Sequence, residues 1–176
     1  IPEFLEAPNV LGIGEIGLNK NSRNEKTILE EHIDLAVRHD TLILVHTPHL
    51  EDKLKGTRYI VDALRAHGGV NPDRVIIDHC EEHTVRIPSE AGMWAGLTLY
   101  PDTKCTPQRA ADILETVGFE RIWANSAADW GISDPLALPK LLRELRQRGH
   151  ARETLQKIAW DNPVAFLSQS PKFAPR

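Results

Sequence analysis

The clearest fold signal in this chain is the stretch Val10-Leu11-Gly12-Ile13-Gly14-Glu15-Ile16-Gly17-Leu18. It predicts an apolar strand over residues 9–14 that ends at the carboxylate of Glu15, with glycines that let the backbone approach a neighbour or a ligand closely. The glycine spacing is not the dinucleotide-binding fingerprint, because no acidic residue follows at the strand end required about 20 residues later. The alternative is a glycine-rich turn with an exposed Glu15.

Short apolar runs recur after this stretch and alternate with amphipathic helices. Further strands are predicted over residues 41–46, 74–79, 93–99 and 121–126. Helices are predicted over residues 24–39, 57–67, 107–117, 135–148 and about 151–168, with a short candidate over 81–91. This alternation is typical of parallel βα units, here in one α/β domain over residues 1–176. An open five-stranded sheet fits the length better than a complete (β/α)8 barrel of about 250 residues, and periodicity alone does not separate the two.

The composition is that of a soluble globular protein. Charged residues make up 26% of the chain and the formal net charge is −4, which gives no support to binding of nucleic acid or an anionic membrane. The two cysteines, Cys80 and Cys105, exclude a disulfide framework and favour a reducing, cytoplasmic compartment. No apolar run approaches the roughly 20 residues of a membrane helix. Because the chain opens on Ile1 in what reads as the tail of an element, we expect an N-terminal segment to be missing.

Candidate metal ligands stand at or near the ends of four predicted strands: Glu15, His46, His79 and Asp129. In a closed parallel barrel the strand ends converge, so these side chains are expected to meet around one or two divalent ions. Imidazole and carboxylate ligands favour zinc or manganese over calcium, with magnesium as a further alternative. A carboxylate such as Asp129 can also accept a proton from activated water. Each imidazole has the alternative of a hydrogen-bonded structural role, and Asp129 that of a turn residue.

Two further residues are candidates for contact with a substrate. His49 follows His46 by three positions, but Pro48 argues against a helix that presents both imidazoles. Lys104 follows the fourth predicted strand and can hold an anionic group, although a surface lysine is the ordinary interpretation. Cys80 can in principle coordinate a metal, yet a lone, partly buried cysteine is more often inert.

The combination of Gly14-Glu15-Ile16-Gly17-Leu18, Val45-His46 and Asp78-His79 resembles the TatD-like metal-dependent hydrolases of the amidohydrolase superfamily. The resemblance extends from Val10 to about Phe166 and implies a (β/α)8 barrel of TIM type, of which this chain holds the last five βα units. It also implies a divalent metal centre at the carboxyl ends of the strands. In that centre Glu15, His46 and His79 are ligands and Asp129 is both ligand and general base.

The chain departs from the pattern of that family in three places. The His-x-His pair of the first barrel strand has no counterpart among the eight histidines, Asn19 stands where the family has Asp, and Asn125-Ser126 replaces a Glu-Thr-Asp motif, with Asp129 displaced. The resemblance therefore implies that about three N-terminal strands are absent. We expect a missing N-terminal segment or a partner chain to complete the barrel, because residues 1–176 alone would expose two sheet edges.

These observations predict a metal-dependent hydrolase that directs activated water at an ester, amide or phosphoester bond of a small molecule. One alternative is a TatD-type deoxyribonuclease, against which the acidic charge balance counts. The other is a non-catalytic binding or assembly module derived from a barrel, which the missing first-strand ligands and the displaced Asp129 favour.

Overall fold

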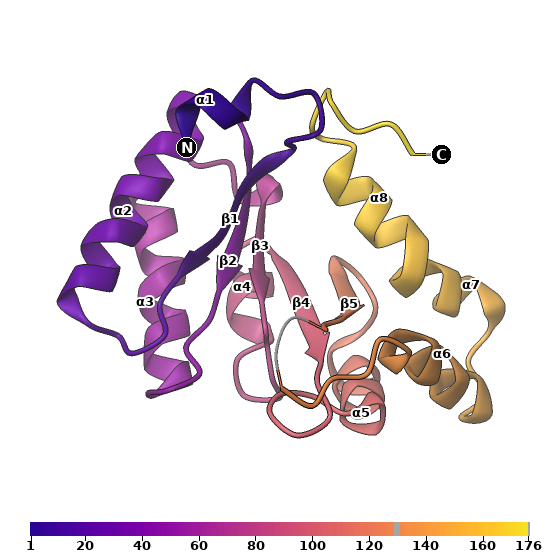
Figure 1. Ribbon diagram of the computed structural model, residues 1–176. Helices are drawn as coiled ribbons and strands as arrows, with labels where there is room; N and C mark the ends of the chain where they lie inside the picture. Colours follow the sequence, from indigo (N-terminus) through magenta and orange to yellow (C-terminus); the bar gives the residue numbers. More distant parts are fainter. Residues whose placement is uncertain (129–130, 176) are drawn as a thin grey trace.

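A parallel β-sheet forms the centre of the molecule (Figure 1). The computed structural model describes residues 1–128 and 131–175. In this part of the chain five strands pair in sequence order, and every pair is parallel. The strands are β1 (Gly12–Gly17), β2 (Leu42–His46), β3 (Val75–Asp78), β4 (Trp94–Leu99) and β5 (Ile122–Ser126). The predicted alternation is confirmed, and the apolar runs mark the strands because both faces of this sheet are largely covered.

Helices connect consecutive strands and continue after β5. They are α1 (Pro2–Leu5), α2 (Arg23–Arg38), α3 (Lys53–Ala66), α4 (Arg86–Glu90), α5 (Pro107–Val117), α6 (Ala137–Gln147), α7 (Arg152–Gln156) and α8 (Asn162–Leu167). A 3₁₀ turn (Pro72–Arg74) precedes β3, and a π-helical turn (Lys157–Asp161) joins α7 to α8. The predicted last helix is therefore three consecutive helical segments, in which Pro163 lies in the first turn of α8, where a missing N–H is tolerated.

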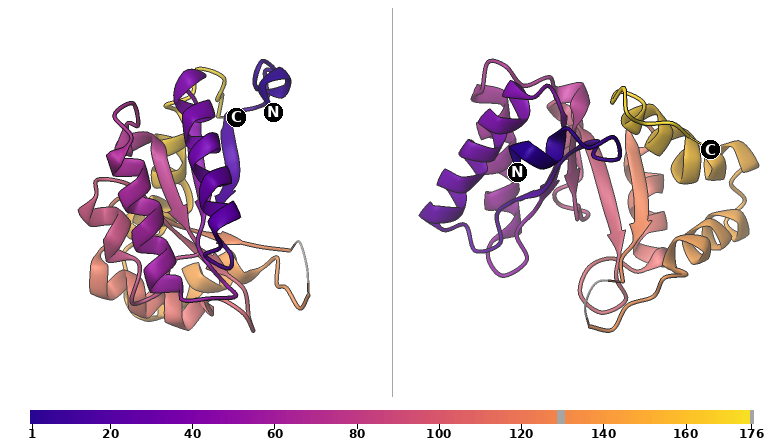
Figure 2. Two further views of the ribbon diagram at one scale, coloured as in Figure 1. Left: turned by 90° about the vertical axis from the view of Figure 1, so that its left-hand side faces the viewer. Right: turned by 45° about the horizontal axis from the view of Figure 1, so that its top comes forward.

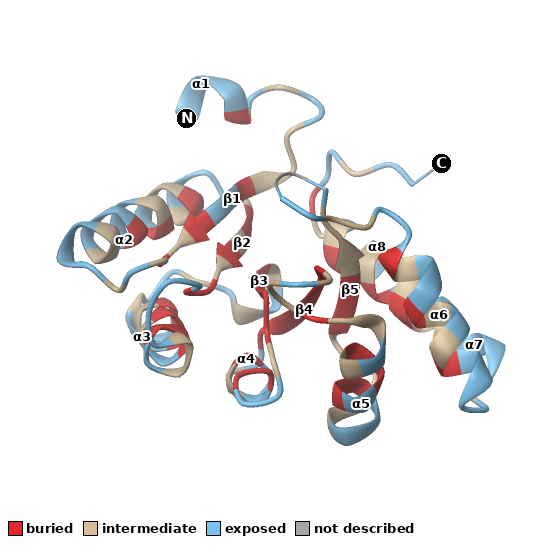
Figure 3. Cartoon of the chain, turned by 60° about the horizontal axis from the view of Figure 1, so that its bottom comes forward, coloured by how far each residue is buried: buried red, intermediate tan, exposed pale blue. Residues whose placement is uncertain are grey.

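The helices α2, α3, α4 and α5 lie along one face of a curved sheet, as Figure 3 shows. A doubly wound open sheet would carry its helices on both faces and reverse its strand order at a switch point. The described strands pair in sequence order without a switch point, so a doubly wound open sheet is excluded and the molecule is part of a barrel wall. Figure 2 shows α6, α7 and α8 beyond β5, at the opposite end of the sheet from α2.

Strand β1 lies unusually close to β2, and glycine makes this possible. A Cβ atom added at Gly12 would lie 2.8 Å from Leu42 Cβ, and one at Gly14 would lie 2.7 Å from Leu44 Cβ. The pairing register shifts between Ile13 and Ile16 and then continues. The prediction that the strand ends before Glu15 is therefore wrong: β1 runs on to Gly17, because the ladder to β2 resumes after the irregularity.

Apolar side chains pack on both faces of the sheet. The larger core lies between the sheet and the outer helices and includes Ile33, Val45, Leu64 and Leu97. A smaller cluster lies on the inner face: Leu42, Ile76, Trp94, Trp123 and Phe166. There α8 places the Phe166 ring 5.7 Å from that of Trp94 and 5.2 Å from that of Trp123. The inner face thus has its own apolar floor.

A groove of about 770 Å³ opens on this inner face. Its apolar lining includes Leu11, Leu42, Leu44, Trp123, Phe166 and Leu167, and Glu15 and Asp78 reach it as well. The edge strands β1 and β5 each pair with a single neighbour in the described part of the chain. No helix described here is long and apolar enough to cross a bilayer.

The contact between β3 and β4 leaves no room for a methyl group at Gly96. A Cβ atom there would lie 2.9 Å from the carboxyl carbon of Asp78, whereas one at Gly68 would have nothing within 4 Å. We expect Gly96→Ala to lower the free energy of unfolding by about 1–3 kcal/mol through overpacking. Gly68→Ala should change it by less than about 0.5 kcal/mol. Urea unfolding of both variants checks this, and equal stabilities would contradict it.

Candidate metal centre

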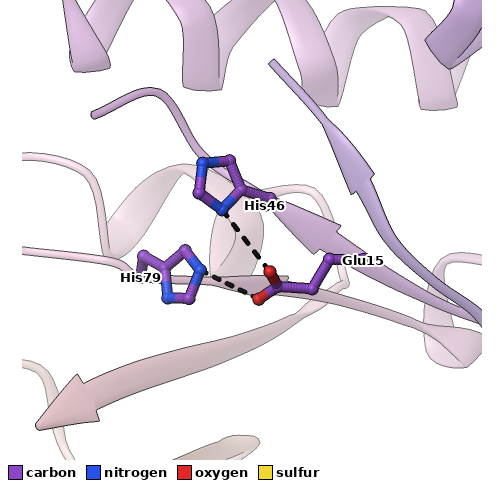
Figure 4. Close-up of side chains that lie close together, drawn as sticks. All are labelled: Glu15, His46 and His79. Atoms are coloured by element: carbon purple, nitrogen blue, oxygen red, sulfur yellow. Dashed lines mark ion pairs between the residues drawn. The ribbon is translucent and has the colours of Figure 1, made fainter. Parts of the chain in front are cut away.

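Three of the four predicted ligands lie together at the carboxyl end of the sheet (Figure 4). Glu15, His46 and His79 each offer an atom within 4.8 Å of those of the other two. Glu15 Oε1 lies 2.9 Å from His79 Nε2, and Glu15 Oε2 lies 3.7 Å from His46 Nδ1. The two imidazole rings meet edge to face with centroids 4.7 Å apart. The fourth predicted ligand, Asp129, lies outside the described residues.

The local backbone explains why these side chains converge. His46 is the last residue of β2, and Glu15 stands where the pairing of β1 is irregular. His79 follows β3 directly with a left-handed φ of +60°, a conformation that the surroundings must hold in place. Its N–H donates to Asp78 Oδ1 over 2.7 Å, and its carbonyl accepts a hydrogen bond of 2.8 Å from Lys53 Nζ.

The charge of Glu15 suits a ligand that must be ionised. Contacts with His46 and His79 hold the pKa of this carboxyl well below its usual range and outweigh the effect of partial burial, which acts in the opposite direction. Its side chain is 45% exposed, so the open part of the site lies toward the groove. Glu15 is therefore negatively charged at neutral pH and accessible from the inner face.

His79 Nε2 is a buried polar atom without a hydrogen-bond partner in the described part of the chain. The residue is only 5% exposed, and this nitrogen faces Glu15 Oε1 at 2.9 Å without the geometry of a hydrogen bond. Buried polar atoms normally have a partner, so an unpaired one calls for an explanation. Two imidazoles and a carboxylate form a donor set that fits zinc or a similar divalent ion, and three protein ligands are typical of catalytic sites.

Of the two predicted substrate contacts, Lys104 lies beside the cluster, and His49 lies in an exposed loop. Lys104 Nζ lies 3.1 Å from His79 Nδ1, so this lysine belongs to the immediate surroundings of the cluster. His49 is exposed in the loop after β2, where its N–H donates to Asn19 Oδ1 over 3.3 Å. Partial desolvation, followed by the charges of Lys53 and Lys104, lowers the pKa of the His49 imidazole. Both lysines lie near the site, and Lys53 pairs with Glu81 Oε1 at 3.0 Å.

A buried polar network behind His79 was not predicted. Asp78 is 5% exposed and accepts hydrogen bonds from Thr98 Oγ1 at 2.9 Å and from Asn125 Nδ2 at 3.2 Å. Alternation counted back from an inward-facing His79 predicts that Asp78 faces the helices. This is wrong, because Asp78 shares the inner face with Ile76 and Asn125, and it is His79 that departs from the alternation. The available signal was Thr98 itself, a polar residue within the otherwise apolar run Trp94–Leu99.

The matching family model is "TatD related DNase", which covers residues 1–124 of this chain. The chain belongs to the TatD-related family. An uncharacterized metal-dependent hydrolase from Methanocaldococcus jannaschii is 29% identical over 168 residues, which span 94% of this chain and 64% of that protein. The predicted family is thereby confirmed. This TatD-related chain spans less than two thirds of the length of that relative.

Solved structures extend the comparison to the fold. The crystal structure of a TatD-like protein from Archaeoglobus fulgidus matches with a TM-score of 0.72 and 29% identity, over 95% of this chain and 64% of that one. A phosphotriesterase homology protein from Escherichia coli, complexed with phosphate in its active site, matches with a TM-score of 0.74 and 17% identity, over 88% and 58% of the two chains. The predicted class, an α/β barrel of which this chain is part, is confirmed.

The cysteines take no part in the cluster. Cys80 Sγ donates to Ile77 O over 3.3 Å, and both thiols are buried. Burial raises the pKa of each thiol to about 12, so both thiols stay protonated at pH 8. We expect Ellman's reagent to label neither thiol within minutes in the native protein and both in guanidinium. Native labelling as fast as in guanidinium would contradict this burial.

Proposed function

We propose that this chain carries the C-terminal share of the metal centre of a TatD-type hydrolase. Glu15, His46 and His79 would hold one or two divalent ions, with zinc first, manganese second and magnesium as a further choice. The observation that carries this proposal is the buried, unpartnered Nε2 of His79 opposite an ionised Glu15. Family membership and the metal dependence named for the Methanocaldococcus relative support it.

The proposed reaction is hydrolysis of an ester, amide or phosphoester bond in a small molecule. A bound divalent ion would supply a Lewis acid and activate water. Lys104, beside His79, and His49, in the loop after β2, would bind an anionic part of the substrate. Asp129 would be a ligand and take the proton from water, as the family pattern implies. Asn125 is the alternative to Asp129 as the ligand from the last strand; its amide nitrogen donates to Asp78.

We further propose that additional barrel strands, from a missing N-terminal segment or a partner chain, cover the groove and complete the site. The groove is lined by apolar side chains of the kind that fill the inside of a closed barrel. Glu15 is 45% exposed toward it, so ligands from neighbouring strands would reach the metal from that side. The Methanocaldococcus and Archaeoglobus relatives are longer, since this chain spans 64% of each. Their additional length can include such strands.

The main alternative within the family is a deoxyribonuclease. The family model carries that name, and Lys53 and Lys104 lie near the cluster. The net charge of −4 counts against a broad nucleic-acid surface. Cleavage of DNA by the metal-loaded protein, with esters, lactones and small phosphoesters untouched, would favour this alternative. Retained metal without turnover of any of these substrates would favour a non-catalytic module.

Metal analysis tests the proposed ligands directly. After purification without chelator, we expect one or two equivalents of divalent metal per intact protein. His79→Ala should weaken metal binding at least about tenfold, because it removes a buried ligand. His67→Ala is the matched control, since this histidine pairs with Asp34 at the surface and should leave binding unchanged. Intact protein without stoichiometric metal would refute the proposed function.

Self-association of residues 1–176 tests the open groove. Two unpaired sheet edges and an apolar inner face should make this chain oligomerise or bind a hydrophobic dye when it is produced alone. Leu44→Glu, in the groove lining, should reduce dye binding, whereas Leu50→Glu, at an exposed position of the next loop, should not. Sedimentation and dye fluorescence give the readout. A monomer with a stable, cooperative unfolding transition would contradict the need for added strands.

A further inference from the structure

The second ring nitrogen of His79 is held by a hydroxyl group. His79 Nδ1 lies 2.6 Å from Thr98 Oγ1, and both residues are buried, at 5% and 2% exposure. Thr98 Oγ1 has one proton, and it lies 2.9 Å from Asp78 Oδ1, to which it donates. A hydroxyl that donates its only proton elsewhere can offer only lone pairs to the imidazole. The proton between Thr98 and His79 therefore belongs on Nδ1.

The carboxylate of Asp78 holds the far end of this chain of hydrogen bonds. It accepts from the N–H of His79 at 2.7 Å and from Asn125 Nδ2 at 3.2 Å, in addition to Thr98. Because Asp78 Oδ1 accepts from Thr98, it fixes the direction in which the Thr98 hydroxyl points. Gly96 leaves the space that Asp78 occupies, since a Cβ atom there would lie 2.9 Å from the Asp78 carboxyl carbon.

We propose that Thr98 and Asp78 are positioning residues that hold His79 with a proton on Nδ1, so that Nε2 is the ring nitrogen available to a metal beside Glu15. This inference rests on the proposed function, in which Nε2 is a metal ligand. The Nε2 atom is buried and has no hydrogen-bond partner among the described residues, as expected of a lone pair kept for a cation. Such a partner on the far nitrogen orients the ring and raises its basicity as a ligand.

Lys104 is the alternative hydrogen-bond partner of His79 Nδ1, and it would reverse the placement of the proton. The geometry disfavours this arrangement. Its ammonium lies 3.1 Å from the same Nδ1 and can only donate, so a hydrogen bond from Lys104 would require an unprotonated Nδ1. The proton would then stand on Nε2 and point at Glu15, where the metal should bind. The shorter contact to Thr98 and the absence of a hydrogen bond from Nε2, within the part of the chain described, support the Thr98 arrangement.

Nitrogen NMR of the metal-free wild-type protein tests the tautomer without any substitution at Thr98. With ¹⁵N-labelled histidine above neutral pH, the His79 signals are identified by their loss in His79→Gln. We expect Nδ1 to carry a proton, and addition of zinc should shift the Nε2 signal while Nδ1 stays protonated. An unprotonated Nδ1 in the wild-type protein would overturn the proposal and assign the Lys104 arrangement.

Metal affinity of Thr98 variants tests the consequence. Thr98→Val keeps the shape and removes the hydroxyl, so we expect zinc affinity, measured by chelator competition, to fall about 10–100-fold, with His79 in mixed tautomers. Thr98→Ser, which keeps the hydroxyl, should restore the zinc affinity and the single His79 tautomer. Thr57→Val is the control, because this buried hydroxyl donates to Lys53 O within α3.

The outcomes separate this proposal from the function on which it rests. A folded Thr98→Val with wild-type affinity and tautomer would overturn the positioning role while leaving the metal centre intact. If Thr98→Val does not fold, the wild-type spectrum still decides the tautomer. A wild-type protein that carries the Nδ1 proton and binds no zinc would overturn the metal role of His79 and, with it, the reason proposed for this hydrogen-bond chain.

Discussion

The parallel pairing of β1, β2 and β3 in sequence order is the constraint on which the site depends. Parallel strands that follow one another through outer helices all end at the same edge of the sheet. Gly17 pairs with His46, and His46 pairs with Asp78, so the residues at these ends lie at one level. Glu15 and His79 meet His46 there, although the three residues are far apart in the sequence. Gly12 and Gly14 secure this pairing, because side chains at either position would force β1 away from β2.

The inner face of the sheet divides into an apolar part and a polar part. Phe166 and the two tryptophans beside it fill the amino-terminal side, while Asp78, Thr98 and Asn125 lie behind the cluster at the carboxyl side. Burial of a carboxylate is costly unless donors surround it, and Asp78 has donors from three residues. Because the Thr98 hydroxyl donates to Asp78, its oxygen is left to accept a hydrogen bond from His79 Nδ1. Burial of the Asp78 carboxyl group and orientation of the His79 ring thus have one structural origin.

Much of the fold could be predicted because its signals are local. Each of the last four strands was placed within about one residue at either end, since a strand buried on both faces is a short apolar run between turns. The errors have physical causes. β1 extends past Glu15 because its pairing with β2 resumes after an irregularity. Asp78 faces inward because it alternates with Ile76, whereas the left-handed backbone of His79 breaks the alternation between these two neighbours.

The sequence by itself determined where the strands lie along the chain, the family and the residue types available as ligands. These depend on local apolar runs and short motifs. Only the tertiary structure decided which of those residues meet and what lies behind them. Thr98 is 19 residues from His79, and Asn125 is 47 residues from Asp78. Contacts over such separations depend on sheet register and on space left by glycines such as Gly96, and no periodicity within a single strand contains that information.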